Sequence, residues 1–242
     1  MTEIIPAVLP KNYEDLKNKI ALVRDIASLV QVDICDGVFV KNLTWPFLAR
    51  GDEESFLSNS FDEHFHKILN EEEGMPFWED VEFELDLMVA HAVENFDIYT
   101  KLGPKRIVFH LEAKEIQRDL EEFKNFLEGI DLYIRDSIAI GVAISPDVSL
   151  PDTFTIIPSV DFVQVMGIDE EGKQGEEFDD KCLEHIRNLK EKFPGLTISV
   201  DGGVNFDSAP KIIEAGADHL VIGSAIFNTG DIIDTIERFR NL

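Results

Sequence analysis

Cysteine is almost absent from this sequence, because only Cys35 and Cys182 occur among its 242 residues. Two cysteines are too few for a disulfide framework or for a cysteine-based zinc site. Basic residues are scarce as well: 22 Lys and Arg stand against 48 Asp and Glu, which leaves a formal net charge of −26. We therefore expect neither nucleic acid nor a membrane surface as a partner, since both are negatively charged.

Long hydrophobic runs and targeting segments are also lacking. No stretch approaches the roughly 18 consecutive apolar residues of a transmembrane helix. The first ten residues carry no Lys or Arg before their short apolar run, unlike a secretory signal. A cytoplasmic protein with an acidic surface fits these absences, and a hydrophobic fraction of 44% is ample for a core.

Short apolar runs alternate with helical patterns along the chain. The runs typical of buried strands lie at 4–9, 28–34, 83–89, 106–113, 137–144, 161–167, 196–202 and 218–225. Amphipathic helical patterns separate most of them, at 12–26, 178–193, 207–215 and 231–239. Eight such repeats predict an α/β fold, a (β/α)8 TIM barrel, as a single domain over residues 1–242. A doubly wound open sheet is the alternative, but no GxGxxG turn follows any of the runs.

Residues 44–82 interrupt this alternation after the second predicted strand. A βα connection usually has about two to six residues, so we interpret this segment as an insertion. Its two Trp and five Phe allow two interpretations: a lid or interface element, or an additional helix pair packed by its own aromatic residues. The histidines His64 and His66 would point apart on a helix, and exposed helical positions explain them better than metal ligation.

Three carboxylates follow the predicted strands closely enough to meet at one end of the barrel. Asp33, Asp86 and Asp201 all lie at the C-terminal ends of apolar runs, where barrels place their catalytic groups. Burying an unpaired charge costs several kcal/mol, so Asp33 within a β-branched run needs a partner or a function. Asp36, in contrast, is interpreted as fixing the loop before Gly37.

An ordered set of motifs resembles the ribulose-phosphate 3-epimerase family. The motifs are VDICDGVFVKN, DLMV, VFHLEA, GVAISP, VQVMG, SVDGGV and GSAIF, and together they span nearly the whole chain except residues 44–82. The resemblance implies a barrel of the ribulose-phosphate-binding type and an isomerase of the pentose phosphate pathway. Its substrate would be a sugar phosphate, D-ribulose 5-phosphate, which is inverted at C3 to D-xylulose 5-phosphate. Asp33 and Asp201 match the two acid/base aspartates of the family, which are needed because the proton leaves one face and returns to the other.

The family's metal site is altered in this chain. Family members usually have His at the positions of Gln31 and Asp86, so the resemblance implies the ligands Gln31, Asp33, Asp86 and Asp201. This set contains only oxygen donors and would suit Mg²⁺ or Mn²⁺ better than Zn²⁺. Such a cation would stabilise an enediolate between the two proton transfers. The alternative is that the metal has been lost and Asp86 hydrogen-bonds within a repurposed site. His110 is expected in a second layer or at the barrel mouth.

Phosphate binding is implied by the segments that follow the sixth, seventh and eighth strands. The matching positions are Gly202, Gly203, Gly223, Ser224, Lys173, Gln174 and Gly175. Backbone N–H groups commonly bind phosphate at these ends of a barrel. Met88 and Met166 match methionines that pack around the enediolate, although core filling explains them as well.

Other functions stay open at this point. The chain could be an epimerase or lyase for another sugar phosphate, because Ala7 replaces a serine whose hydroxyl contacts substrate in the family. The related decarboxylases carry a D-x-K-x-x-D run on the third strand. The third predicted strand of this chain has no Lys, which disfavours a decarboxylase. A non-catalytic sugar-phosphate-binding protein would not need two opposed aspartates. The aromatic insertion could also supply an interface in a homo-oligomer.

Overall fold

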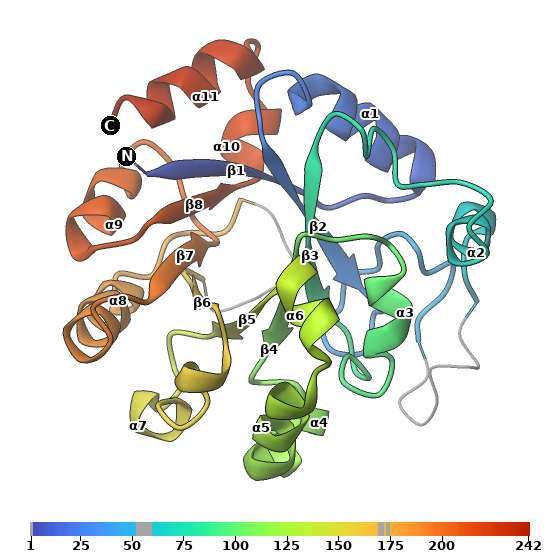
Figure 1. The fold of residues 1–242 in the computed structure, drawn as a ribbon. Helices are drawn as coiled ribbons and strands as arrows, with labels where there is room; N and C mark the ends of the chain where they lie inside the picture. The colour runs from blue at the N-terminus through green and yellow to red at the C-terminus, as the bar shows by residue number, and fades with distance from the viewer. Residues whose placement is uncertain (1, 52–59, 169–171, 173–174) are drawn as a thin grey trace.

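The structure is a computed structural model that describes residues 2–51, 60–168, 172 and 175–242 (Figure 1). Eight parallel strands follow one another around a closed barrel, and β1 pairs with β8 to complete the ring. The strands are β1 (Glu3–Val8), β2 (Leu29–Cys35), β3 (Glu82–Met88), β4 (Arg106–His110), β5 (Ala139–Ile144), β6 (Phe162–Met166), β7 (Thr197–Asp201) and β8 (His219–Ile222). The predicted (β/α)8 fold is therefore confirmed.

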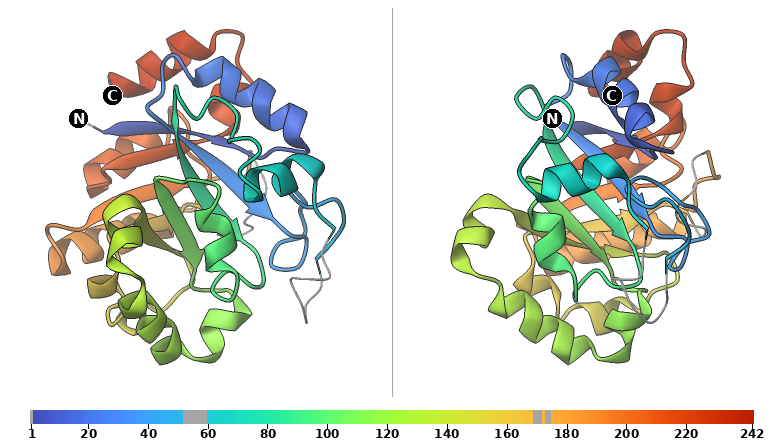
Figure 2. Two further views of the ribbon diagram at one scale, coloured as in Figure 1. Left: turned by 45° about the vertical axis from the view of Figure 1, so that its right-hand side comes forward. Right: turned by 90° about the vertical axis from the view of Figure 1, so that its right-hand side faces the viewer.

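Helices lie around the outside of the ring, as all three ribbon views show (Figures 1 and 2). They are α1 (Tyr13–Val23), α2 (Glu63–Leu69), α3 (Phe96–Thr100), α4 (Lys114–Arg118), α5 (Leu120–Gly129), α6 (Leu132–Ser137), α7 (Leu150–Thr153), η2 (Ile157–Ser159), α8 (Lys181–Lys192), α9 (Ala209–Ala215), α10 (Ser224–Phe227) and α11 (Ile232–Arg240). Among the described residues, none of these helices has the length and apolar character required to cross a membrane.

Strand β2 has two buried faces with different chemistry. In β2, Val30 and Val32 belong to the large apolar core that also contains the helix residues Leu16 and Ile20. Successive side chains of a strand point to opposite faces, so the intervening Gln31 points into the barrel. All seven residues of β2 are buried. The apolar run of the sequence therefore combines an outward packing face with an inward polar face.

A lower polar layer fills the barrel toward the N-terminal ends of its strands. Its centre is Arg106 on β4, whose Nε lies 2.6 Å from Oε2 of Glu84 on β3. The guanidinium also donates to Ser199 Oγ at 3.0 Å and lies 3.0 Å from His219 Nδ1. It stacks over the ring of Phe162 at 3.8 Å. Burial raises the pKa of Glu84 to about 7, although Arg106 acts in the opposite direction.

The segment between β2 and β3 places α2 on the outside of the barrel between α1 and α3 (Figures 1 and 2). Trp45 is fully buried, packs edge-on against Phe65 at 5.9 Å and donates from Nε1 to Asp62 at 3.1 Å. His64 stacks on Tyr13 of α1 with ring centroids 3.8 Å apart. These contacts join the segment to α1. A role for residues 44–82 as a lid or interface stays a prediction, and residues 52–59 lie outside the described part of the chain.

Candidate active site

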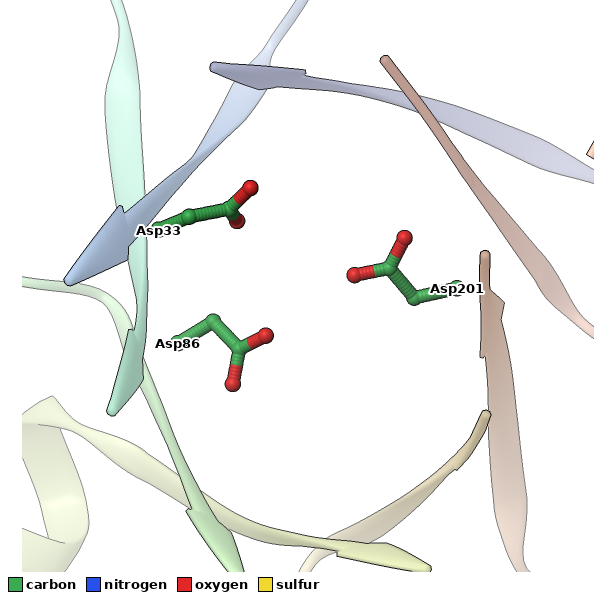
Figure 3. Close-up of side chains that lie close together, drawn as sticks. All are labelled: Asp33, Asp86 and Asp201. Atoms are coloured by element: carbon green, nitrogen blue, oxygen red, sulfur yellow. The ribbon is translucent and has the colours of Figure 1, made fainter. Parts of the chain in front are cut away.

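Three carboxylates meet at the C-terminal mouth of the barrel. Asp33 on β2 lies in register with Asp86 on β3, and Asp201 ends β7 on the other side of the ring. One oxygen of each carboxylate lies within 4.8 Å of one oxygen of each of the other two. Figure 3 shows that Asp33 and Asp201 point toward each other across the mouth, with Asp86 beside Asp33. Asp86 is fully buried, and Asp33 is nearly so.

Gln31 joins the two carboxylates that the sequence predicts as acid/base groups. Its Nε2 donates to Asp33 Oδ1 and to Asp201 Oδ2, each at 2.8 Å. The amide is fully buried, and its Oε1 has no hydrogen-bond partner within the described structure. A buried carbonyl oxygen without a partner is costly, so this oxygen is available to an additional group.

Asp86 is contacted on both of its oxygens. His110 Nε2 at the end of β4 lies 2.6 Å from Oδ1, and Gln164 Nε2 on β6 donates to Oδ2 at 3.3 Å. His110 therefore contacts Asp86 directly from the neighbouring strand β4. Gln164 was not predicted as a site residue, although a glutamine between two valines of a buried strand is a signal for an inward polar position.

Two of the carboxyl groups, those of Asp33 and Asp201, have raised pKa values, and burial is the main cause. Burial raises the pKa of Asp33 well above its ordinary value, and the nearby charges of Asp201 and Asp86 raise it further. The pKa of Asp201 is raised to about 7 by burial and by Asp86, while Gln31 acts in the opposite direction. A carboxyl group that titrates near neutral pH can serve as acid and as base in one reaction. The pair therefore has the chemistry of reversible proton transfer.

The donor set fits a divalent cation. Three clustered carboxylates repel one another, and a doubly charged ion would relieve that repulsion. The unpartnered Oε1 of Gln31 could become a fourth oxygen donor after a 180° turn of the amide, which at present directs Nε2 toward the aspartates. An all-oxygen set suits Mg²⁺ or Mn²⁺ rather than Zn²⁺. His64 and His66 lie on α2, outside this cluster.

A cavity of about 180 Å³ opens beside the aspartates. Its lining includes Asp33 and Asp201 and seven further residues predicted for substrate: Met88, Met166, Gly175, Gly202, Gly203, Gly223 and Ser224. Glu176 and Asn205 also line it and were not predicted. The remaining two predicted positions, Lys173 and Gln174, lie outside the described residues.

Glycine is required at the floor of this cavity. Gly203 has φ +66°, and a Cβ at this position would lie 2.6 Å from the Cα of Phe178. Gly202 has φ +95°, and its Cβ would meet the side chain of Ile168 at 2.6 Å. Only glycine adopts this conformation at such close approach. The turn after β7 therefore packs closely against Ile168 and Phe178 of the segment after β6.

Asp36 has a structural role, as predicted. Its Oδ1 accepts from the N–H groups of Val38 and Phe39 at 2.8 and 3.1 Å, and its Oδ2 accepts from Ala90 at 2.8 Å. The side chain thereby ties the loop after β2 to the loop after β3. It takes no place in the aspartate cluster.

Comparisons with known proteins point to one family. The sequence model of the ribulose-phosphate 3-epimerase family matches residues 66–227. A ribulose-phosphate 3-epimerase of Eremothecium gossypii is 28% identical over 98% of this chain and 91% of its own length. The cytoplasmic isoform of Oryza sativa is 27% identical over 98% of the chain and 92% of its own length, and the Bacillus subtilis enzyme is 25% identical over 99% of both.

Solved structures support the fold. KGPDC from Streptococcus mutans, determined in complex with a sugar phosphate, aligns with a TM-score of 0.67 at 13% identity and covers 99% of this chain and 96% of its own. A 3-hexulose-6-phosphate synthase from Salmonella typhimurium aligns with a TM-score of 0.64 at 13% identity over 99% and 97% of the two chains. At such identity these similarities establish the barrel alone.

Proposed function

The chain belongs to the ribulose-phosphate 3-epimerase family and is an isomerase, and from this premise we propose that it converts D-ribulose 5-phosphate to D-xylulose 5-phosphate. The observation that carries the proposal is the position of Asp33 and Asp201, which point toward each other across the barrel mouth (Figure 3). Burial raises the pKa of Asp33 well above its ordinary value and that of Asp201 to about 7. Inversion at a carbon requires a proton acceptor on one face and a proton donor on the other.

The proposed reaction consists of two proton transfers. One aspartate, as carboxylate, removes the proton of C3. The electron pair of the broken C–H bond forms the C2–C3 double bond, and the π pair of the C2 carbonyl moves onto its oxygen, which gives an enediolate; these shifts reverse when C3 is protonated. The other aspartate, as carboxylic acid, returns a proton to C3 from the opposite face and becomes the carboxylate. The reverse reaction exchanges the two roles, so Asp33 and Asp201 must each be stable in both protonation states. Met88 and Met166 line the same cavity and would pack against the planar intermediate.

A divalent cation, Mg²⁺ or Mn²⁺ in preference to Zn²⁺, is part of this proposal. Asp33, Asp86, Asp201 and the Oε1 of Gln31 would hold it. Bound there, it would supply positive charge against the negative charge that develops on the substrate oxygens. The environment of the carboxylates supports this proposal, because burial, and after it the charge of a neighbouring aspartate, raises the pKa of both Asp33 and Asp201.

The glycine-rich part of the cavity would bind the phosphate group. Gly202, Gly203, Gly223 and Ser224 are adjacent to the ends of β7 and β8 and line the cavity together with Gly175. The cavity lining contains no Lys or Arg among the described residues, so backbone N–H groups would be the main donors. Ala7, which replaces a substrate-contacting serine of the family, also lines the cavity, so six-carbon ketose phosphates should be tested beside the pentose.

We place the reaction in the cytoplasm, as the name of the rice relative suggests.

Proton exchange at C3 tests the proposal directly. Ribulose 5-phosphate in D₂O is followed by NMR with protein and Mn²⁺ or Mg²⁺, and deuterium is expected at C3 together with the xylulose product. Asp33→Asn and Asp201→Asn should each lower turnover by about 10²–10⁴-fold. Asp25→Asn is the matched control, because the side chain of Asp25 is 88% exposed. Exchange that is undiminished in both site variants would remove these two residues from the reaction.

A further inference from the structure

His110 was expected in a second layer or at the barrel mouth, and the structure gives it a specific partner there, the Asp86 carboxylate. Its Nε2 lies 2.6 Å from Asp86 Oδ1, and neither side chain is exposed to solvent. From the other side of the barrel, Gln164 Nε2 donates to Asp86 Oδ2 at 3.3 Å, and Gln164 is also fully buried. We infer that His110 is a positioning residue for the proposed cation site, with Gln164 as its weaker partner, and that both fix the Asp86 carboxylate as a ligand.

The carboxylate needs such fixing because its own torsion does not provide it. Rotation about the terminal bond of an aspartate is broad, so the side chain alone does not determine the direction of its oxygens. Asp33 and Asp201 repel the Asp86 carboxylate when all three are ionised. Donors on both oxygens, from β4 and β6, hold its plane in one orientation. Each oxygen keeps a further lone pair for a cation.

The contact with His110 is the stronger of the two. At 2.6 Å it is at the short end for a hydrogen bond to a carboxylate, whereas the Gln164 contact is long. Phe39 lies against the His110 ring with centroids 5.2 Å apart, so the imidazole is itself held by packing. Groups that hydrogen-bond a metal ligand in this way typically contribute about 10–100-fold to metal affinity. Family members usually carry an imidazole at the position of Asp86. In this chain an imidazole, that of His110, lies on the next strand, β4, and supports the carboxylate at that position.

This inference rests on the cation that the proposed function includes, and its test measures binding rather than activity. Mn²⁺ affinity is determined by isothermal titration calorimetry for the wild type, His110→Leu and His110→Gln. Leu keeps the bulk and removes the donor, while Gln places an Nε2 at the same number of bonds from Cβ as the Nε2 of His. We expect His110→Leu to bind Mn²⁺ about 10–100-fold more weakly, and His110→Gln to recover most of the loss.

The matched control is His219→Leu, the same substitution in the lower polar layer, where His219 contacts Arg106 and Ser199. It should leave Mn²⁺ affinity unchanged. Equal affinity of His110→Leu and the wild type overturns the inference, as does a loss in His110→Gln as large as in His110→Leu. If His110→Leu does not fold, Mn²⁺ affinity is measured for Gln164→Leu instead. An affinity of Gln164→Leu equal to that of the wild type then overturns the inference. A wild type that binds no Mn²⁺ overturns the inference and the cation proposal together, while C3 exchange, measured with and without added metal, tests the epimerase proposal separately.

Discussion

Glu84→Gln is expected to stabilise the barrel above neutral pH and to leave its stability nearly unchanged in mild acid. Glu84 is fully buried, and its Oε2 lies 2.6 Å from Arg106 Nε. Two opposing effects act on this carboxylate. Burial disfavours the charged form, whereas Arg106 favours it, and the net result is a pKa of about 7 instead of 4.5. Burial is therefore the larger effect, and ionised Glu84 weakens the fold.

The size and sign follow from proton linkage. Because the pKa is higher in the folded state, the contribution of Glu84 to stability is fully present below pH 4.5 and is lost as the pH rises to about 7. The difference between 4.5 and about 7, at about 1.4 kcal/mol per pH unit, amounts to about 3 kcal/mol at pH 8. Glutamine resembles the protonated carboxyl in charge and volume. The variant should therefore match the wild type near pH 5 and exceed it by up to about 3 kcal/mol at pH 8.

Urea unfolding at pH 5 and pH 8, in chelator, measures the two differences. Glu191→Gln is the matched control, because Glu191 is exposed on α8 and its neutralisation reports the effect of one unit of surface charge. A Glu84→Gln protein that is less stable than the wild type at pH 8 would refute the reasoning. It would mean that the ion pair with Arg106 outweighs burial, since breaking such a pair costs about 3–5 kcal/mol when attraction dominates.

Three further variants test other parts of the structure. Asp36→Ala should lower the free energy of unfolding, measured by urea titration, by about 2–4 kcal/mol, because three backbone N–H groups lose a carboxylate acceptor. A change below about 0.5 kcal/mol would contradict the structural role of Asp36. Gln31→His combined with Asp86→His should shift metal preference in calorimetry from Mn²⁺ toward Zn²⁺, and an unchanged preference would show that neither residue is a ligand. Gly203→Ala should raise the KM for the sugar phosphate by at least about tenfold with a smaller effect on kcat, since the new Cβ would displace Phe178. An unchanged KM would exclude the turn after β7 from phosphate binding.

The barrel was predictable because each strand and the main helices have a recognisable hydrophobic pattern within their own segment of the sequence. Each of the eight apolar runs overlaps a strand, and the helical patterns at 12–26 and 178–193 contain α1 and α8. Boundaries were less predictable. The last run was placed at 218–225, but β8 ends at Ile222 and Ser224 begins α10. Hydrophobicity alone does not mark this transition, because both elements are apolar and Gly223 separates them by its conformation.

The site was predictable only where it depends on strand ends. Asp33, Asp86 and Asp201 could be placed at one mouth because all parallel strands end there. The contact of Asp86 with Gln164 could not be predicted, because Gln164 comes from β6, which does not neighbour β3 in the ring. Such contacts depend on barrel diameter and strand stagger, which the sequence pattern does not reveal.

Ring closure has a consequence for the order in which this protein can become functional during synthesis. Asp33 and Asp86 leave the ribosome early, whereas Asp201 follows more than a hundred residues later. The ring closes only when β8 pairs with β1. A nascent chain that ends before β7 therefore carries two of the three carboxylates and none of the opposing geometry. The proposed proton transfer between two faces of a sugar therefore requires the chain through Asp201 at the end of β7.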